Sequence, residues 1–223
     1  MSRWQSEKST VAAAARRMSA MGLVTGASGN VSRKLEGADS PPLMAITPMG
    51  RRYDSMAADD VVVVDFDAES VEGDGTPSSE SLLHLAIYRA RPDVGAVIHT
   101  HSVFASVLAV AGRGLPAVID EATIAVGGAL QVSRYAFPAS EELATNVCEA
   151  LGDRKAALIR NHGMVGVGSD PEEALEICEL VEHVAQVYVH ATAIGGATEL
   201  PPDVVESEVA IYRMRNPNAG GVD

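Results

Sequence analysis

Three histidines in this sequence stand where their side chains could share one metal ion. His99 and His101 are separated by one residue, and side chains two positions apart on a strand lie on the same face. His162 stands at a second expected strand end, before Gly163, where the backbone can turn tightly. Three neutral imidazoles that leave one coordination position open are typical of catalytic zinc. A His-x-His pair taken alone is equally compatible with a structural role.

The carboxylate that could complete such a site is Glu80, in the segment Pro77-Ser78-Ser79-Glu80 at the start of an expected helix. Helix N-termini attract anions, so the two serine hydroxyls and the free N–H groups there could hold a phosphate while Glu80 reaches a metal or a substrate proton. The alternative is structural, with Ser79 capping the helix and Glu80 complementing its dipole.

Hydrophobic periodicity and turn residues predict the elements that position these side chains. Helices are expected at residues 6–21, 79–90, 103–111, 140–151, 171–194 and 204–215, and strands at 43–47, 61–66, 156–160, 165–167 and a stretch ending at 99–101. Residues 35–42 and 67–76 are expected to be surface loops. The histidines therefore fall at strand ends, where α/β proteins commonly place their sites. We expect one three-layer α/β/α domain over residues 1–223, with its core at about 8–195 and a C-terminal helix and tail at 201–223.

Composition narrows the class of protein. The chain has 223 residues, of which 47% are hydrophobic, enough for a sizeable core. Its 17 basic and 30 acidic residues give a net charge of −13, which disfavours a nucleic-acid partner. No apolar run approaches the length of a membrane span, and no apolar signal segment follows Met1, so we expect a cytoplasmic protein without a membrane partner. Cys148 and Cys178 are expected to be free thiols.

Several motifs, in the same order along the chain, resemble the class II aldolase and adducin head-domain family, which includes fuculose-phosphate aldolase and ribulose-phosphate 4-epimerase. The resemblance covers roughly residues 12–194. Its motifs are Gly29-Asn30-Val31-Ser32, Ile46-Thr47-Pro48-Met49-Gly50, Ser78-Ser79-Glu80, Arg91-Pro92-Asp93 with residues 96–101, Gly127-Gly128 and Asn161-His162-Gly163. It implies a central mixed, largely antiparallel sheet flanked by helices.

The resemblance also implies roles for individual residues. It implies that zinc, or manganese or cobalt in its place, is bound by His99, His101 and His162, with Glu80 as the fourth ligand and the catalytic base. It further implies a pocket for the phosphate of a sugar phosphate, lined by Gly29, Asn30, Thr47, Gly50, Ser78 and Ser79.

The activity implied is retro-aldol cleavage of a ketose 1-phosphate to dihydroxyacetone phosphate and an aldehyde, through a metal-stabilised enediolate. A sugar-phosphate 4-epimerase or a 3-keto acid phosphate decarboxylase would use the same enolate, and a dehydratase could share the scaffold. An alternative of a different class is a non-catalytic, adducin-like assembly domain, although such domains typically lack the complete ligand set. Because the family usually forms four-fold tetramers with active sites between subunits, we expect a homotetramer.

The sequence departs from the family where the aldehyde would bind. The family's tyrosine before the Gly-Gly pair, contributed across the subunit interface, is absent here, and Asp120 or Glu121 could face the site instead. For the second catalytic tyrosine, near the C-terminus, Tyr212 is the local candidate.

The remaining histidines have alternative explanations. His84 follows Glu80 by one helical turn and fits either support of the site or core packing. His183 and His190, seven residues apart on an expected helix, fit a helix face or a subunit contact.

Overall fold

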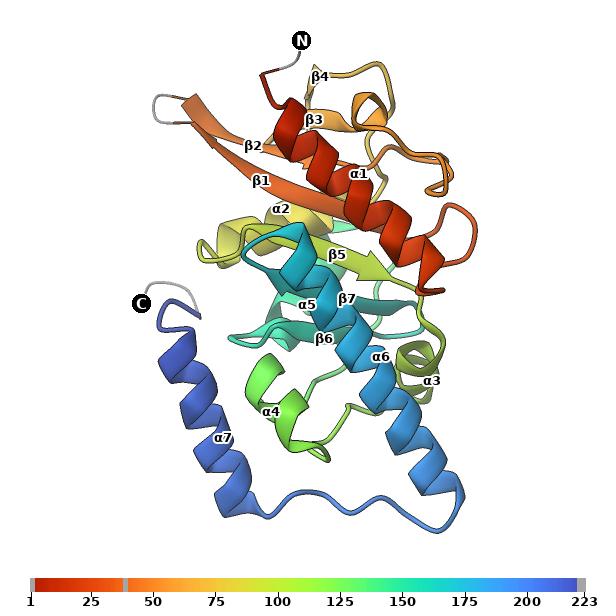
Figure 1. Ribbon diagram of the computed structural model, residues 1–223, viewed down its shortest axis with the longest axis vertical. Helices are drawn as coiled ribbons and strands as arrows, with labels where there is room; N and C mark the ends of the chain where they lie inside the picture. The colour runs from red at the N-terminus through yellow and green to blue at the C-terminus, as the bar shows by residue number, and fades with distance from the viewer. Residues whose placement is uncertain (1–2, 38–39, 220–223) are drawn as a thin grey trace.

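The computed structural model describes residues 3–37 and 40–219, and Figure 1 shows the arrangement of their helices and strands. The helices are α1 (Gln5–Ala20), α2 (Ser81–Ala90), α3 (Val103–Ala111), α4 (Asp120–Val126), α5 (Glu141–Leu151), α6 (Pro171–Ala193) and α7 (Pro202–Arg215), with a short 3-10 helix at Ala58–Asp60. The strands are β1 (Asn30–Gly37), β2 (Ser40–Ile46), β3 (Val62–Asp65), β4 (Ser70–Glu72), β5 (Ala96–Thr100), β6 (Ala156–Ile159) and β7 (Gly163–Gly168). Among the described helices, none is both long enough and apolar enough to cross a bilayer.

The strands form one sheet in the order β4-β3-β2-β1-β5-β7-β6, and every pairing between neighbouring strands is antiparallel. The expectation of a largely antiparallel sheet is confirmed. A parallel contact is limited to an isolated bridge between Val132 and Leu158. Strand β5 lies between β1 and β7, so its backbone is paired on both sides.

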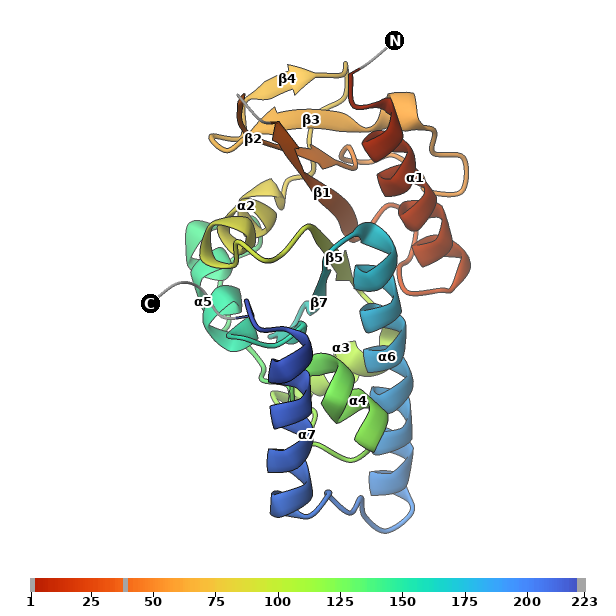
Figure 2. The ribbon, with the colours of Figure 1, turned by 60° about the vertical axis from the view of Figure 1, so that its left-hand side comes forward.

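Helices cover both faces of this sheet, as Figure 2 shows, which confirms the three-layer α/β/α prediction. Because successive side chains of a strand point to opposite faces, each strand contributes to two separate cores. Val63 and Ile98 belong to the core under α1, α3 and α6, whereas Val62 and Val97 belong to the core under α2 and α5. A sheet buried on both faces explains why β5 is apolar throughout until it reaches its histidine.

Two predicted loops contain strands. Residues 35–42 form much of the tip of the β1–β2 hairpin, with residues 38 and 39 outside the described part of the chain, and residues 67–76 include β4. Residues 67–76 include the edge strand β4, and residues 35–42 flank the turn of a hairpin, so the composition of both segments was typical of loops. Helix α4 was not predicted, since its seven residues are too few to give a periodic pattern.

The C-terminal helix α7 packs on α4 at the Gly127-Gly128 pair. A Cβ on Gly127, whose φ is +90°, would lie 2.7 Å from the Tyr212 ring, and a Cβ on Gly128 would lie 3.1 Å from a methyl of Val209. The Tyr212 hydroxyl is buried and donates to the carbonyl oxygen of Asp153 at 2.6 Å. The glycine pair thus makes room for α7.

A methyl group at Gly127 should therefore loosen α7. We expect Gly127→Ala to lower the free energy of unfolding by about 3 kcal/mol or more, because it adds a clash with a buried ring to the strain of a positive φ. Gly22→Ala is the matched control: its φ is also positive, but its Cβ would meet no atom within 4 Å, so strain alone should cost about 1–2 kcal/mol. Urea unfolding measures the free energy of unfolding of both variants. Equal decreases in the two would contradict the claim that Gly127 makes room for α7.

Candidate metal centre and substrate pocket

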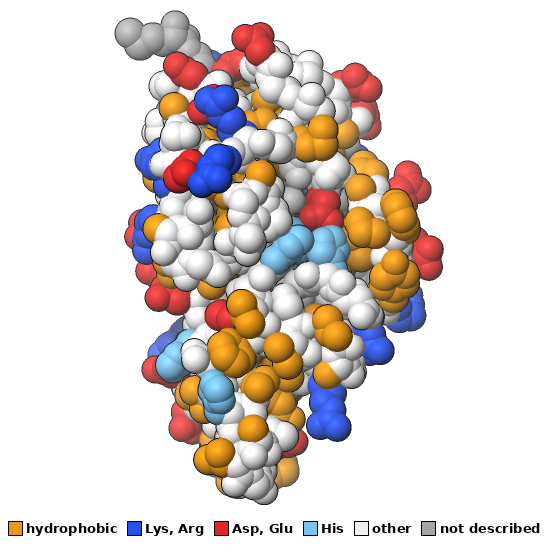
Figure 3. Space-filling view, turned by 90° about the vertical axis from the view of Figure 1, so that its right-hand side faces the viewer, with side chains coloured by type: hydrophobic (Ala, Val, Ile, Leu, Met, Phe, Trp, Pro, Cys, Tyr) orange, Lys and Arg blue, Asp and Glu red, His pale blue; other side chains and the backbone are white. Residues whose placement is uncertain are grey.

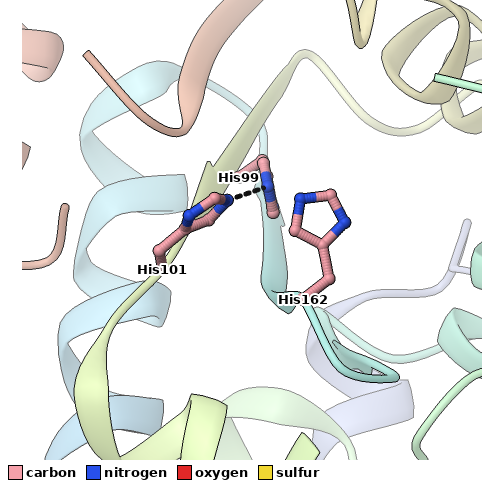
Figure 4. Close-up of side chains that lie close together, drawn as sticks. All are labelled: His99, His101 and His162. Carbon is pink, nitrogen blue, oxygen red and sulfur yellow. Dashed lines mark hydrogen bonds between the residues drawn. The ribbon is translucent and has the colours of Figure 1, made fainter. Parts of the chain in front are cut away.

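The three predicted histidines come together at one point beside the sheet, as Figure 4 shows. His99 is the fourth residue of β5, His101 follows the last residue of that strand, and His162 lies in the turn between β6 and β7. One ring nitrogen from each lies within 4.8 Å of the others, and the Nε2 atoms of His99 and His101 are 2.9 Å apart. Among the described residues, these three histidines form the group of side chains that could hold one metal ion.

The backbone fixes which nitrogen of His99 faces the others. Its Nδ1 lies 2.8 Å from the carbonyl oxygen of Met164 on β7, so Nδ1–H donates to that carbonyl. The Nε2 atom then carries the lone pair and points into the cluster, which is the usual arrangement behind a metal-binding histidine.

Burial favours the neutral form of the His99 and His101 imidazoles. The pKa of His99 lies well below its ordinary value because the ring is fully buried, with smaller effects from His101 and His162. The pKa of His101 is lowered as well, by burial first and by His162 second. A metal binds the neutral form of imidazole, so these two rings are in the ligand form at neutral pH.

Glu80 faces the same cluster. One carboxylate oxygen, Oε2, lies 3.1 Å from Nε2 of His99, and the other, Oε1, lies 3.5 Å from Nε2 of His162. The residue is 7% exposed, and Oε1 has no hydrogen-bond partner among the described residues. A buried, unpartnered carboxylate oxygen beside three imidazole nitrogens is a donor set that fits a divalent ion such as zinc.

The contacts of Glu80 also distinguish its two possible roles, as a carboxylate of the site or as a residue that complements the dipole of the helix. Helix α2 begins at Ser81, and Glu80 occupies the N-cap position, but its side chain makes no capping hydrogen bond. Instead it accepts a hydrogen bond from Nδ2 of Asn30 at 3.3 Å, and the same amide donates to Oγ of Ser78 at 3.0 Å. The side chain is therefore committed to the histidine cluster rather than to the helix end.

A cavity of about 220 Å³ opens beside this cluster. Its lining residues are Ala27, Ser28, Gly29, Asn30, Pro48, Met49, Gly50, Ser78, Ser79, Glu80, His101, Pro138 and His162. No lysine or arginine is among these residues, so an anion bound here would meet hydroxyl and backbone N–H groups together with any bound metal. In Figure 3 histidine side chains near the middle of this face lie in a hollow beside an acidic side chain, apart from the histidines lower down on the same face.

Five of the six predicted phosphate-pocket residues line this cavity, and Thr47 does not. Thr47 is fully buried, and its hydroxyl accepts a hydrogen bond from the backbone N–H of Val31 at 3.2 Å. Gly29 is required by the backbone, because its φ is +72° and a Cβ there would lie 2.5 Å from the carbonyl oxygen of His99. The Tyr53 hydroxyl, which belongs to none of the motifs noted in the sequence, donates to the Gly29 carbonyl.

The other candidate residues lie outside the cavity of a single chain. Asp120 and Glu121 begin α4, where their carboxylates complement the helix dipole, and Tyr212 is a buried residue of α7 whose ring packs against Gly127. His183 and His190 lie on α6, where the His190 ring is 5.3 Å from the Phe104 ring.

The fold and this site define a family. The sequence profile of the Class II Aldolase and Adducin N-terminal domain family matches residues 9–189, most of the chain, so the chain belongs to this family. The resemblance expected from the motifs is thereby confirmed.

Its relatives include enzymes named for sugar-phosphate cleavage. The chain is 35% identical over 205 residues to the 5-deoxy-D-ribulose 1-phosphate aldolase of Bacillus thuringiensis serovar kurstaki, covering 91% of this chain and 93% of that protein. It is 34% identical to the L-fuculose phosphate aldolase of Escherichia coli K12, covering 87% and 86%. A solved structure of an L-fuculose 1-phosphate aldolase superposes with a TM-score of 0.87 at 32% identity, covering 96% and 98%. The prediction of a class II aldolase-type enzyme is confirmed at this level.

Loss of one imidazole should weaken metal binding strongly. We expect His101→Ala to lower zinc affinity on the order of a hundredfold or more, because two histidines and a carboxylate remain. His183→Ala, which removes a histidine from α6, is the matched control and should bind zinc like the parent. Competition against a chromophoric chelator gives both affinities. The site assignment would be contradicted by a His101→Ala protein that retains parental affinity.

Proposed function

We propose that the chain is a divalent-metal-dependent aldolase that cleaves a ketose 1-phosphate to dihydroxyacetone phosphate and an aldehyde. Zinc, or manganese or cobalt in its place, is held by His99, His101 and His162. The observation that carries the proposal is the buried carboxylate of Glu80, which faces a cluster of three imidazoles at the wall of a cavity. The names of the relatives supply the substrate class.

The residues of the chain divide the work of the reaction. A divalent ion at the histidines supplies Lewis-acid stabilisation of the enediolate charge. Breaking the bond between C3 and C4 of the ketose removes a proton from the C4 hydroxyl and returns one to C3. Glu80 is the base in the cavity that can carry this proton, and Asn30 holds its carboxylate by the hydrogen bond to Oε2.

The phosphate is bound without a lysine or arginine of the same chain. We assign it to the part of the cavity formed by Gly29, Gly50, Ser78 and Ser79, where backbone N–H groups and hydroxyls can surround its oxygens. Asn30 borders the same region. Thr47 contributes from outside, by fixing the backbone of Val31 next to Asn30.

The test is release of dihydroxyacetone phosphate from a panel of ketose 1-phosphates that includes the 5-deoxyribulose and fuculose compounds. Metal-loaded protein should release it, and chelator-stripped protein should not until metal is restored. Glu80→Gln should keep bound metal and lose about a hundredfold or more of its turnover, because the amide cannot accept the proton.

Each contrary result has a definite meaning. A fully active Glu80→Gln protein would remove Glu80 from the proton transfer. Protein that binds one metal per chain and releases no dihydroxyacetone phosphate would point to epimerase or decarboxylase chemistry on the same enolate. Protein that binds no metal would favour an assembly domain.

The working unit is, we infer, a cytoplasmic homotetramer of one-domain chains, with each active site shared between subunits. Asp120 and Glu121 lie outside the cavity of their own chain, so a role in catalysis requires a neighbouring subunit. An apolar stripe on α3, directly after the metal-binding strand, supports this: Val103, Val107 and Val110 are each 44–61% exposed and lie on one helix face.

We expect light scattering to give four times the chain mass of 23.3 kDa. A charge on the stripe, as in Val107→Lys, should lower that mass, because the lysine would be desolvated in a subunit interface. The matched control is Val71→Lys on β4, which is 54% exposed at the opposite edge of the sheet and should leave the mass unchanged. A stable monomer of the unaltered chain would contradict the shared site.

A further inference from the structure

Three buried polar side chains, joined by hydrogen bonds, lie between α2 and β1, close to the histidine cluster. The Oγ of Ser32 is 2.6 Å from Nδ1 of His84 and 2.7 Å from the hydroxyl oxygen of Tyr88. Ser32 and His84 are fully buried, and Tyr88 is 3% exposed. His84 and Tyr88 follow Glu80 by four and eight residues, so all three lie on one side of α2 and its N-cap.

The direction of these hydrogen bonds places the proton of the His84 ring. In the described part of the chain, the acceptor within hydrogen-bond distance of the Tyr88 hydroxyl is Oγ of Ser32. Tyr88 therefore donates to Ser32. Ser32 has one proton, which it then donates to Nδ1 of His84. Burial lowers the pKa of His84 to about 3, so the ring is neutral and its single proton sits on Nε2.

The resulting Nε2–H is a donor without an acceptor. It is buried, and no described residue forms a hydrogen bond with it. Buried polar groups in folded proteins nearly always have partners, so an unpaired one calls for a ligand or a second arrangement of its neighbours. The groups whose charges act on the His84 ring are His99 and Glu80, which are both part of the proposed metal site.

Glu80 offers a carboxylate acceptor on the same side of α2 and its N-cap, although no hydrogen bond or ion pair joins it to His84 in this structure. Its Oε1 is likewise buried without a hydrogen-bond partner among the described residues. In metal-loaded protein the Nε2 atoms of His99 and His162 would be directed at the ion, and among the described residues Asn30 would be left as the hydrogen-bond donor to the carboxylate. An ionised carboxylate in such a place is stabilised by each further donor.

We propose that His84 is a positioning residue for Glu80: its Nε2–H donates to the Glu80 carboxylate in the metal-loaded protein, while Ser32 and Tyr88 hold the ring in that tautomer. The proposal rests on the proposed function, in which Glu80 carries the proton. The alternative is that the hydrogen-bonded side chains of Ser32, His84 and Tyr88 only pack the core.

Two substitutions of His84 separate the two ring nitrogens. His84→Gln places an amide N–H near the position of Nε2 and gives up the contact with Ser32. His84→Asn places its amide near the position of Nδ1, so it can keep the contact with Ser32 but loses the donor toward Glu80. Both side chains are polar and smaller than or similar to histidine, so thermal melting serves as the control for general destabilisation.

We expect His84→Asn to lower kcat about tenfold or more, the usual cost of removing a group that supports a metal ligand, with KM changed less than about threefold. His84→Gln should retain kcat within about threefold. A packing role predicts the reverse order, because glutamine is the variant that breaks the bond to Ser32. Equal losses in the two variants, or full activity of His84→Asn, would overturn the proposal.

Cobalt-loaded protein gives a readout that needs no turnover. The visible absorption bands of Co²⁺ respond to the geometry of its ligands, so His84→Asn should shift them and His84→Gln should match the parent. If the parent proves inactive on every ketose phosphate, the proposed function fails but these spectra still decide the role of His84. Identical spectra for the parent and His84→Asn would overturn it.

Discussion

The burial of His99 at the end of a strand that is paired on both sides is the constraint on which the site depends. An exposed imidazole takes up a proton near neutral pH, whereas burial holds the pKa of His99 well below its ordinary value. The bond from Nδ1 to the Met164 carbonyl then aims the remaining lone pair at one place. His101 and His162 can join it there because β5 and β7 are neighbours, so the end of one strand and the turn before the other lie together.

In the proposed reaction an acidic chain binds a phosphorylated substrate. The chain carries a net charge of −13, and no lysine or arginine of the same chain lines the cavity. Within one chain, anion binding would then come from oriented N–H groups, hydroxyls and a bound metal ion, which act only at short range and in a fixed geometry. In the proposed reaction this arrangement favours a small ligand that offers a phosphate at one end and chelating oxygens near the other.

Much of this could be predicted from the sequence, because it follows from local periodicity. Strand alternation places His99 and His101 on one face, and helical spacing relates His84 to Glu80. What could not be predicted depends on contacts between distant segments. Whether Glu80 caps a helix or faces the histidines is decided by Asn30, fifty residues earlier, and the hydroxyl of Tyr212 is bound by a carbonyl 59 residues away. The elements α4 and β4 are too short for any periodic signal.

The most direct test of the account is a crystal structure of zinc-loaded protein with anomalous diffraction measured on both sides of the zinc absorption edge. We expect one anomalous peak per chain, at a distance of about 2.0–2.2 Å from a nitrogen of each of His99, His101 and His162 and from an oxygen of Glu80. A zinc peak elsewhere, or a peak at the histidines with the Glu80 carboxylate turned away into the helix end, would contradict the claim that these four side chains form one catalytic centre.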